Sequence, residues 1–415
     1  MGKAEPKDIE AGRAVCPSFG RCGGCAFLGL SEEECLKIKE AQVLNCLKAE
    51  GVDTSVFKGI TAAPLQLRYR NKMEYTFGNE VKDGPTILGL HASGSFISIV
   101  PCDECVLVPE DFNRLVKATQ GFVTEKGYGH YHKKLHKGLM RSLIIRRGVR
   151  TGELLVNIVT SSDGEFDEDG YRNCIMSTDL DDSIAGILHT INDSRSDALS
   201  VDEFRILYGR QYYNEEILGL KFRVGAFSFF QTNVEAAERL YLDATGLIDS
   251  FDDKTVFDLY CGTGTMTQFM ARKARKAVGV EIVGEAVDTA RDSASINGLD
   301  NCEFITGDVG EVLSGLEVLP DVIVVDPPRA GIMPKALSKI LSYGVKDIVY
   351  VSCNPKTLAS NLRAASLAGY SPVYIKSYDN FSFTRHIESV ALLKRMIMSK
   401  VMFQENPAVM TAADK

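Results

Sequence analysis

One cysteine stands at the end of a strand-like stretch late in the chain. Ile348–Val351 is apolar and mostly β-branched, which predicts a strand buried on both faces. The strand must stop by Pro355, because proline has no N–H to donate to a neighbouring strand. Cys353 therefore lies at the carboxyl end of a buried strand, where open α/β sheets gather their chemistry, and it is a candidate nucleophile. The alternative is a core cysteine, since free cysteines are among the most buried residues.

Three more cysteines lie close together near the N-terminus. Cys16, Cys22 and Cys25 have the spacing C-x5-C-x2-C, and Gly23-Gly24 allows the tight turn that would aim their sulfurs at one point. Three thiolates are one short of a tetrahedral zinc or iron–sulfur site. The candidates for the fourth ligand are Cys35, Cys46, Cys102 and Cys105.

Four acidic residues fall at the ends of successive predicted strands. Asp258–Thr265 contains a Gly-x-Gly turn between a strand and a helix, and Glu281 ends the next strand, where an acid can bind ribose hydroxyls. The third glycine of a dinucleotide fingerprint is absent, which favours S-adenosyl-L-methionine over NAD. Asp308, at the third strand tip, suits the adenine edge, and Asp326 ends the fourth strand.

The segment Asp326-Pro327-Pro328-Arg329 narrows the reaction. Amino-methyltransferases carry Asp-Pro-Pro followed by an aromatic residue that holds the base. Arg329 stands in that place, which counts against methylation of an exocyclic amine. A carbon acceptor needs a nucleophile that makes the carbon electron-rich, and Cys353 can supply it.

Alternating strands and helices from about residue 225 onward predict a doubly wound, mostly parallel sheet. Before it, short strand-like runs between residues 67 and 160 predict a smaller α+β domain. We expect an N-terminal cysteine segment and helix (1–50), a central domain (51–215), a Rossmann-like domain (216–400) and a tail (401–415).

Composition excludes membrane insertion and a disulfide framework. The net charge is −8, there are 11 cysteines, and no apolar run is long enough for a membrane helix. We therefore expect a cytoplasmic protein with reduced cysteines. Basic residues cluster between Lys126 and Arg150, which together with Arg68, Arg70 and Lys72 predicts a nucleic-acid face. The acidic segment 163–203 reads as a solvated surface.

Taken together, these motifs resemble the RNA uracil-C5 methyltransferase family, which makes 5-methyluridine. The resemblance covers nearly all of residues 16 to 393. The shared motifs are Cys16, Cys22 and Cys25; Phe230-Gln231; Asp258–Gly262; Asp326–Arg329; Ser352–Pro355; and His386–Val390.

The resemblance implies a Rossmann-like S-adenosyl-L-methionine-dependent domain, preceded by a smaller α+β RNA-binding domain and an iron–sulfur segment. It implies a 4Fe–4S cluster rather than zinc, with Cys105 as the fourth ligand. Cys353 would add to uracil C6, and Glu388 would remove the C5 proton after methyl transfer. The expected cofactor-binding residues are Gln231, Tyr260, Thr265, Glu281, Asp308 and Asp326.

The expected substrate is RNA, and 23S ribosomal RNA is favoured over tRNA. Many relatives begin with a TRAM barrel, and only 15 residues precede Cys16 here, so we expect no such barrel. The missing barrel, together with the retained four-cysteine set, looks more like the ribosomal RNA enzymes of the family. We expect a monomer. A non-catalytic RNA-binding or assembly protein is the alternative from another class; a radical enzyme would require C-x3-C-x2-C instead.

Overall fold

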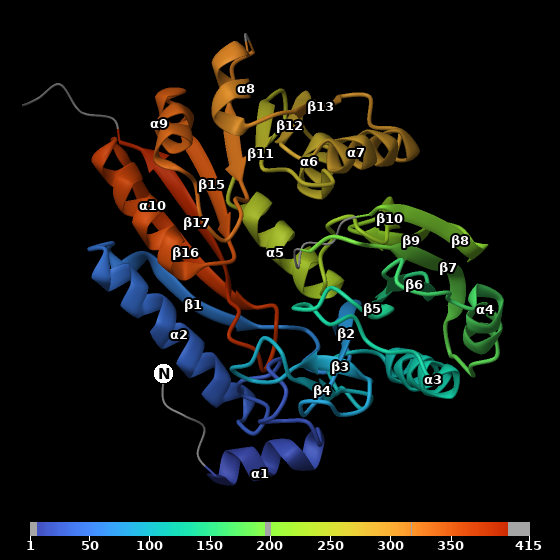
Figure 1. The fold of residues 1–415 in the computed structure, drawn as a ribbon. Coiled ribbons are helices and arrows are strands. Elements are labelled where there is room, and N and C mark those ends of the chain that lie inside the picture. The colour runs from blue at the N-terminus through green and yellow to red at the C-terminus, as the bar shows by residue number, and fades with distance from the viewer. Residues whose placement is uncertain (1–5, 196–200, 317, 397–415) are drawn as a thin grey trace, which may run out of the picture.

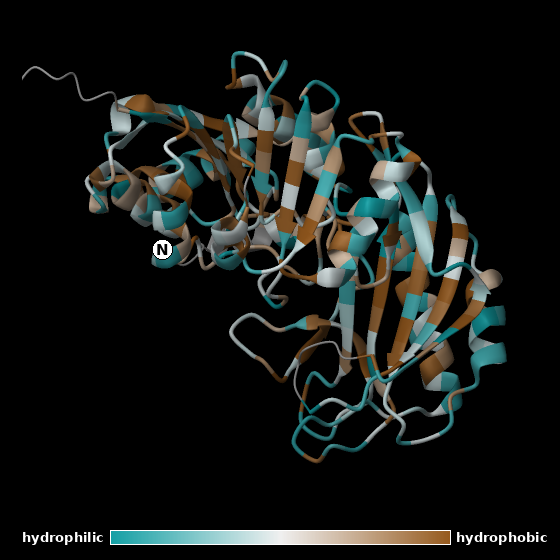
Figure 2. Cartoon of the chain, turned by 90° about the horizontal axis from the view of Figure 1, so that it is seen from above, coloured by the Kyte–Doolittle hydropathy of each residue, from teal (hydrophilic) through white to brown (hydrophobic). Residues whose placement is uncertain are grey.

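The computed structural model describes residues 6–195, 201–316 and 318–396. Two large sheets, of eight and seven strands, organise these residues, and a two-stranded hairpin accompanies them. Figure 2 shows apolar residues concentrated along the strands of both large sheets. Within the described part of the chain, no helix is long and apolar enough to cross a membrane.

The larger sheet is mostly parallel, as the sequence predicts. Its strand order is β1-β16-β17-β15-β14-β11-β12-β13, and only β17 runs antiparallel to its neighbours. The strands are β1 (Phe57–Ala62), β11 (Thr255–Leu259), β12 (Lys276–Glu281), β13 (Cys302–Thr306), β14 (Val322–Val325), β15 (Asp347–Ser352), β16 (Tyr370–Asp379) and β17 (Glu388–Arg395).

Helices cover both faces of this sheet because its central strands are apolar on both faces. Phe257 and Leu259 pack into one core, while Val256 of the same strand packs into the other. The first core is covered by α2 (Glu32–Ala49), α8 (Val309–Gly315), α9 (Pro334–Ser342) and α10 (Pro355–Leu367). On the other side lie α5 (Val234–Gly246) and α6 (Thr265–Ala271), with α7 (Gly284–Ile296) packed on Phe304 of β13.

Residues 32–62 join the large sheet rather than the central unit to which the sequence analysis assigns residues 51–62. β1 pairs parallel to β16, with Ile60 opposite Ser377. Figure 1 shows α2 running alongside α10 and β1. Val43 and Leu47 of α2 are fully buried in the core of the sheet. Helix α2 therefore forms part of the outer layer of the Rossmann-like sheet.

The second sheet has the order β4-β3-β2-β5-β6-β7-β8 and is antiparallel except between β6 and β7. Helices α3 and α4 pack against it. Its elements are β2 (Lys72–Gly78), β3 (Ile87–His91), β4 (Ile99–Pro101), α3 (Glu110–Lys126), β5 (Met140–Arg147), β6 (Glu153–Thr160), α4 (Glu168–Met176), β7 (Ser183–Ile191) and β8 (Glu203–Gly209). The hairpin is β9 (Tyr212–Ile217) with β10 (Leu220–Gly225); α1 (Pro6–Val15) and the short 3-10 helix η1 (Thr54–Val56) complete the fold.

The sequence analysis expects the acidic segment 163–203 to be a solvated surface, but the structure shows that part of it is buried. It contains β7, whose central residues are buried between β6 and β8. The charges lie in the turns around α4 and at the ends of β7, so a buried strand is framed by acidic loops.

Candidate active site

Cys353 lies directly after β15, between the strands that carry the other reactive side chains. β14 and β17 flank β15 on its two sides. Asp326 follows β14, and Glu388 is the first residue of β17. Because β17 is antiparallel, with Ser389 opposite Ser352, its first residue lies at the same sheet edge as Cys353.

The turn after Cys353 is fixed by the asparagine and proline that follow it. Asn354 caps α10 by accepting a hydrogen bond from the backbone N–H of Lys356 (3.1 Å), and Pro355 begins the helix. The Asn354 side chain also donates to the Arg329 carbonyl (2.9 Å). The cysteine turn and the Asp-Pro-Pro-Arg turn are thereby tied together.

The pKa values of the two carboxyl groups and of the thiol are all raised. Burial, and then the nearby charge of Asp326, raises the pKa of Glu388 to about 8. Burial raises the pKa of Asp326 to about 7. The pKa of Cys353 is raised to about 11, by burial first and by both carboxylates after it. Perturbed titratable groups at one sheet edge are typical of an active site.

Arg329 is the cation that opposes these shifts. Its charge lowers the pKa of both Cys353 and Glu388, so it favours the thiolate and the carboxylate. The arginine that replaces the aromatic residue of amino-methyltransferases thus has an electrostatic role at this site.

The glycine-containing turn lies along the same sheet edge. Tyr260, Gly262 and Gly264 all have positive φ (68°, 54° and 74°). A Cβ on Gly264 would stand only 2.6 Å from the Phe304 ring, so this position requires glycine. The tip of β12 closes on the turn, because the Glu281 carboxylate accepts from the Gly262 N–H (3.1 Å).

Five of the six predicted cofactor residues lie at this edge, and two of them have structural roles. Asp308 caps α8 by accepting from the N–H groups of Gly310 (2.9 Å) and Glu311 (3.2 Å). Glu281 also accepts from the Val283 N–H (2.9 Å). An ionised carboxylate has about four acceptor positions, so both acids keep capacity for a ligand.

Gln231 comes from outside the sheet. Its side-chain amide donates to the Tyr241 hydroxyl (2.9 Å) on α5, and its backbone carbonyl accepts from the side chain of Asn71 (3.1 Å) in the central unit. The charge of Asp326 raises the pKa of Tyr241 after burial does, which indicates that Gln231 and Asp326 approach the same space. Thr265 opens α6, and Tyr260 lies near Asp308.

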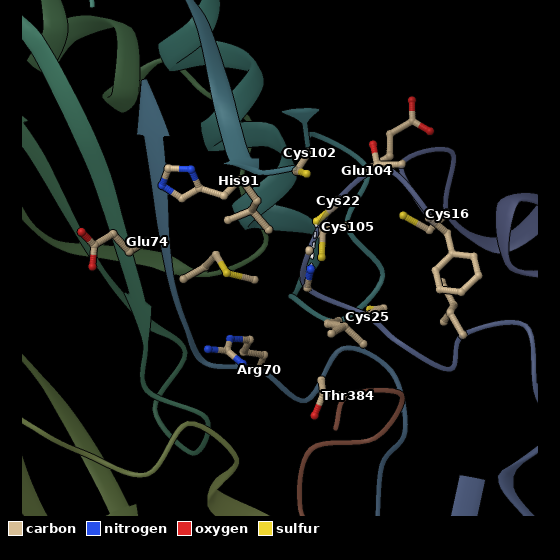
Figure 3. Close-up of a pocket in the computed structure, with 18 of the residues that line it drawn as sticks. Cys16, Cys22, Cys25, Arg70, Glu74, His91, Cys102, Glu104, Cys105 and Thr384 are labelled. Atoms are coloured by element: carbon tan, nitrogen blue, oxygen red, sulfur yellow. Dashed lines mark hydrogen bonds between the residues drawn. The ribbon is translucent and has the colours of Figure 1, made fainter. Parts of the chain in front are cut away.

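A cavity of about 520 Å³ is lined by the N-terminal cysteines. Cys16, Cys22, Cys25 and Cys105 all line it (Figure 3). Burial, followed by the other three sulfurs, raises the pKa of the Cys25 thiol. The Gly24 N–H also points at the Cys22 sulfur (3.3 Å), a contact suited to a thiolate. The cavity extends to His386, two residues before Glu388.

The other cysteine candidates for this cavity differ in their contacts. Cys35 packs in the core that Cys16, Cys25 and Cys105 also contact, but it does not line the cavity, and its thiol donates to the Phe27 carbonyl. Cys46 packs against the large sheet. Cys102 does line the cavity, although its thiol donates to the Val100 carbonyl (3.3 Å) and is 4% exposed. Across the described ranges, no group of three or more His, Cys, Asp or Glu residues is placed to hold a metal ion.

Many basic residues of the predicted nucleic-acid face form hydrogen bonds or ion pairs within the protein. Arg146 is buried and donates to the carbonyls of Ala226 and Ser228, and Arg147 is paired with Asp182. Other basic groups of this stretch are paired or bonded similarly: Lys126, Arg141 and Arg150. Arg68 donates to the carbonyls of Cys105 and Val108. The exposed cations that remain lie mainly in the loop 131–137, where Lys134 and Lys137 are exposed.

Sequence reasoning missed one residue beside the site. Lys39 lies in the middle of α2, where a lysine ordinarily faces solvent, yet it is fully buried. The only local signal was its position among apolar helix residues, and this does not distinguish a buried ion pair from an exposed charge.

Comparisons with known proteins agree with this geometry. Residues 313–396 match the family described as tRNA (Uracil-5-)-methyltransferase, and residues 256–326 match a methyltransferase domain. A Clostridium tetani protein described as an RNA methyltransferase is 46% identical over 94% of this chain and 85% of its own length. An RNA methyltransferase of Caldanaerobacter subterraneus is 45% identical over 94% of this chain and 86% of its own.

A solved structure has the same overall fold. It is the Pyrococcus abyssi tRNA (uracil-54, C5)-methyltransferase in complex with S-adenosyl-L-homocysteine. The TM-score is 0.74 at 26% identity, over 90% of this chain and 85% of that chain.

Proposed function

The chain belongs to the RNA uracil-5 methyltransferase family, and on that premise we propose that Cys353 and Glu388 carry out its chemistry. Its activity is S-adenosyl-L-methionine-dependent methylation of uracil C5 in RNA. The observation that carries the proposal is the antiparallel strand β17, which brings Glu388 to the sheet edge where Cys353 ends β15. Burial raises the pKa values of both groups, and the charge of Arg329 partly offsets this rise in each of them.

Uracil C5 is too weak a nucleophile to take a methyl group unaided. The Cys353 thiolate adds to C6, and the electrons of the C5–C6 double bond move into an enolate. S-adenosyl-L-methionine, when bound, supplies the methyl group that C5 takes up. Glu388 then accepts the C5 proton, the C6–sulfur bond breaks, and Cys353 leaves as the thiolate. The products are 5-methyluracil in the RNA and S-adenosyl-L-homocysteine.

We propose that the cofactor lies along the sheet edge formed by Tyr260, Thr265, Glu281, Asp308 and Asp326, with Gln231 above it. Glu281 fits ribose hydroxyls, because its carboxylate lies against the glycine turn where a cofactor can approach the backbone. Because the target atom lies in RNA, the base must be flipped out of its stack to reach Cys353.

We propose that Cys16, Cys22, Cys25 and Cys105 hold a 4Fe–4S cluster. These four thiols, together with that of Cys102, line one cavity that is much larger than a single ion needs, and a cluster distributes its thiolate ligands over several iron atoms. The cluster would supply a rigid cross-link between the N-terminal segment and the loop before α3. No step of the methyl transfer uses it.

We propose 23S ribosomal RNA as the substrate, on the family resemblance of the four-cysteine set, and hence cytoplasmic action. tRNA is the second candidate, because the Pyrococcus abyssi protein is a tRNA enzyme. Both candidates can be tested by methyl-transfer assays on RNA from cells that lack this gene. Methyl transfer to its ribosomal RNA, with the site mapped by mass spectrometry, supports the first candidate, and transfer to its tRNA alone supports the second.

A mechanism-based trap tests the chemistry. With 5-fluorouridine at the target there is no C5 proton for Glu388 to remove, so the protein should remain attached to the methylated RNA after denaturing electrophoresis. Cys353→Ala should lose both methyl transfer and the adduct. Cys302→Ala is the control, because Cys302 lies on β13, away from β15. Turnover by Cys353→Ala, or an adduct mapped to another cysteine, would overturn the assignment.

A further inference from the structure

A single buried ammonium group holds both ends of the connection that leads to Glu388. Lys39 of α2 is fully buried, and it forms an ion pair with Asp379, the last residue of β16. Its Nζ also donates to the carbonyls of Phe381 (3.2 Å) and His386 (3.0 Å). Three acceptors match the three N–H groups of an ammonium, so its hydrogen-bonding capacity is filled.

The connection spans residues 380–387, between β16 and β17, and other groups hold its middle. The Ala26 and Phe27 N–H groups, directly after Cys25, both donate to the Phe383 carbonyl (2.8 and 3.0 Å). The Tyr69 hydroxyl donates to the Ser382 carbonyl (3.1 Å), and Asn233 donates to the Asn380 carbonyl (2.8 Å). Lys39 differs from these groups because it also reaches the carbonyl of His386, where the chain enters β17.

The anchoring of His386 affects where the Glu388 carboxylate lies. Glu388 follows His386 by two residues, and it opens the strand that pairs with β15. A shift of the chain at His386 moves the Glu388 backbone relative to Cys353. The position of Cys353 itself is fixed by β15 and by the Asn354 cap, which Lys39 does not touch.

We propose that Lys39 is a positioning residue for the proton-removal step: its ammonium, paired with Asp379, fixes the chain entering β17 so that Glu388 reaches the C5 proton of the methylated base. The inference rests on the proposed roles of Cys353 and Glu388. It assigns a function to a side chain that contacts neither the cofactor edge nor the thiol.

A double variant separates positioning from folding. Lys39→Met alone would leave the Asp379 carboxylate buried without its partner, which is strongly destabilising. Lys39→Met with Asp379→Leu removes both charges together, and such replacements of buried ion pairs are often tolerated. The hydrogen bonds to the Phe381 and His386 carbonyls are lost in either case.

The matched control is Lys376→Met. Lys376 lies on the same strand as Asp379 and pairs with Asp243 of α5 (2.7 Å), so this variant also removes a Lys–Asp pair next to the sheet. It leaves the connection 380–387 and its anchors intact.

The experiment is single-turnover methylation of RNA from cells that lack this gene, with methyl-labelled S-adenosyl-L-methionine. Methyl transfer and release of the methylated RNA from protein are timed separately. We expect the double variant to transfer the methyl group within about twofold of the parent rate and to release the RNA roughly tenfold more slowly, since small misplacements cost large factors. The covalent methylated adduct should accumulate, and Lys376→Met should behave as the parent.

Equal slowing of both steps in the double variant would indicate a general structural effect and overturn the inference, and so would unchanged release. Glu388→Gln, run in parallel, tests the premise. If Glu388→Gln stalls after methyl transfer and the double variant does not, the inference alone fails. If Glu388→Gln releases RNA normally, the role of Glu388 in the proposed function fails as well.

Discussion

The side chains of Arg329 and His386 are in hydrogen-bond contact, with Arg329 Nη2 3.0 Å from His386 Nδ1. Loss of hydration, and then the charge of Arg329, lowers the pKa of His386 to about 4. The imidazole is therefore neutral at physiological pH and can accept a hydrogen bond from the guanidinium. This contact joins the turn after β14 to the chain entering β17, so it places the Arg329 charge where it acts on both Cys353 and Glu388.

Arg329→Gln should move the pH dependence of the reaction to higher pH. Both Cys353 and Glu388 act in their deprotonated forms, so kcat/KM rises with pH through their pKa values. Arg329 lowers both values, so its removal raises them. Measurement of kcat/KM between roughly pH 6 and pH 10 checks this shift. Arg385→Gln, an exposed neighbour of His386, should leave the profile in place; an unshifted Arg329→Gln profile would contradict the electrostatic role.

Glu281→Ala should weaken cofactor binding. The variant removes a carboxylate that closes the glycine turn and that we assign to the ribose hydroxyls. Loss of a hydrogen bond to a charged group costs on the order of 1–3 kcal/mol. Calorimetric titration with S-adenosyl-L-homocysteine measures the change. Glu285→Ala, which removes an exposed carboxylate in the first turn of α7, is the control, and the assignment does not survive equal affinity in the two variants.

Cys105→Ala should abolish cluster assembly, because it removes one of the four thiols that we assign as ligands. Iron and acid-labile sulfide in anaerobically purified protein measure this directly, independent of activity. Cys35→Ala should retain both, since the Cys35 thiol faces the Phe27 carbonyl outside the cavity. Cys102→Ala is the informative comparison: loss of iron in this variant, with retention in Cys105→Ala, would make Cys102 the fourth ligand.

Lys134→Glu with Lys137→Glu should weaken RNA binding and flatten its dependence on salt. Each lost phosphate contact lowers the slope of log K against log salt by about one unit or slightly less. Arg147→Gln is the control, because the Arg147 guanidinium is already committed to Asp182 and should not contribute to the slope. Titrations of RNA binding at several salt concentrations give this slope for the parent protein and for each variant. Equal slopes in all three proteins would exclude the loop 131–137 from the RNA-binding face.

Local sequence alone was enough to single out Cys353, the proposed nucleophile, and to predict much of the fold. A buried strand that ends in Ser-Cys-Asn-Pro places Cys353 at a sheet edge, because apolar β-branched residues and proline act over a few neighbouring positions. The same holds for the glycine turn before Thr265 and for the cysteine triplet within ten residues of chain. The alternation of strands and helices after residue 225 predicted a mostly parallel sheet, which the structure confirms.

Only the tertiary structure decided which distant residues meet at these places. Glu388 reaches the sheet edge of Cys353 because β17 inserts antiparallel between β15 and β16, and no local pattern specifies strand order. Cys105, distant in sequence, lines the same cavity as the cysteine triplet. β1 joins a sheet in which its partner strand β16 lies about three hundred residues later. Arg146 and Lys39 are buried against specific acceptors. These outcomes depend on long-range pairing and on the desolvation of charges. Both are properties of the packed chain, so a window of neighbouring residues does not contain them.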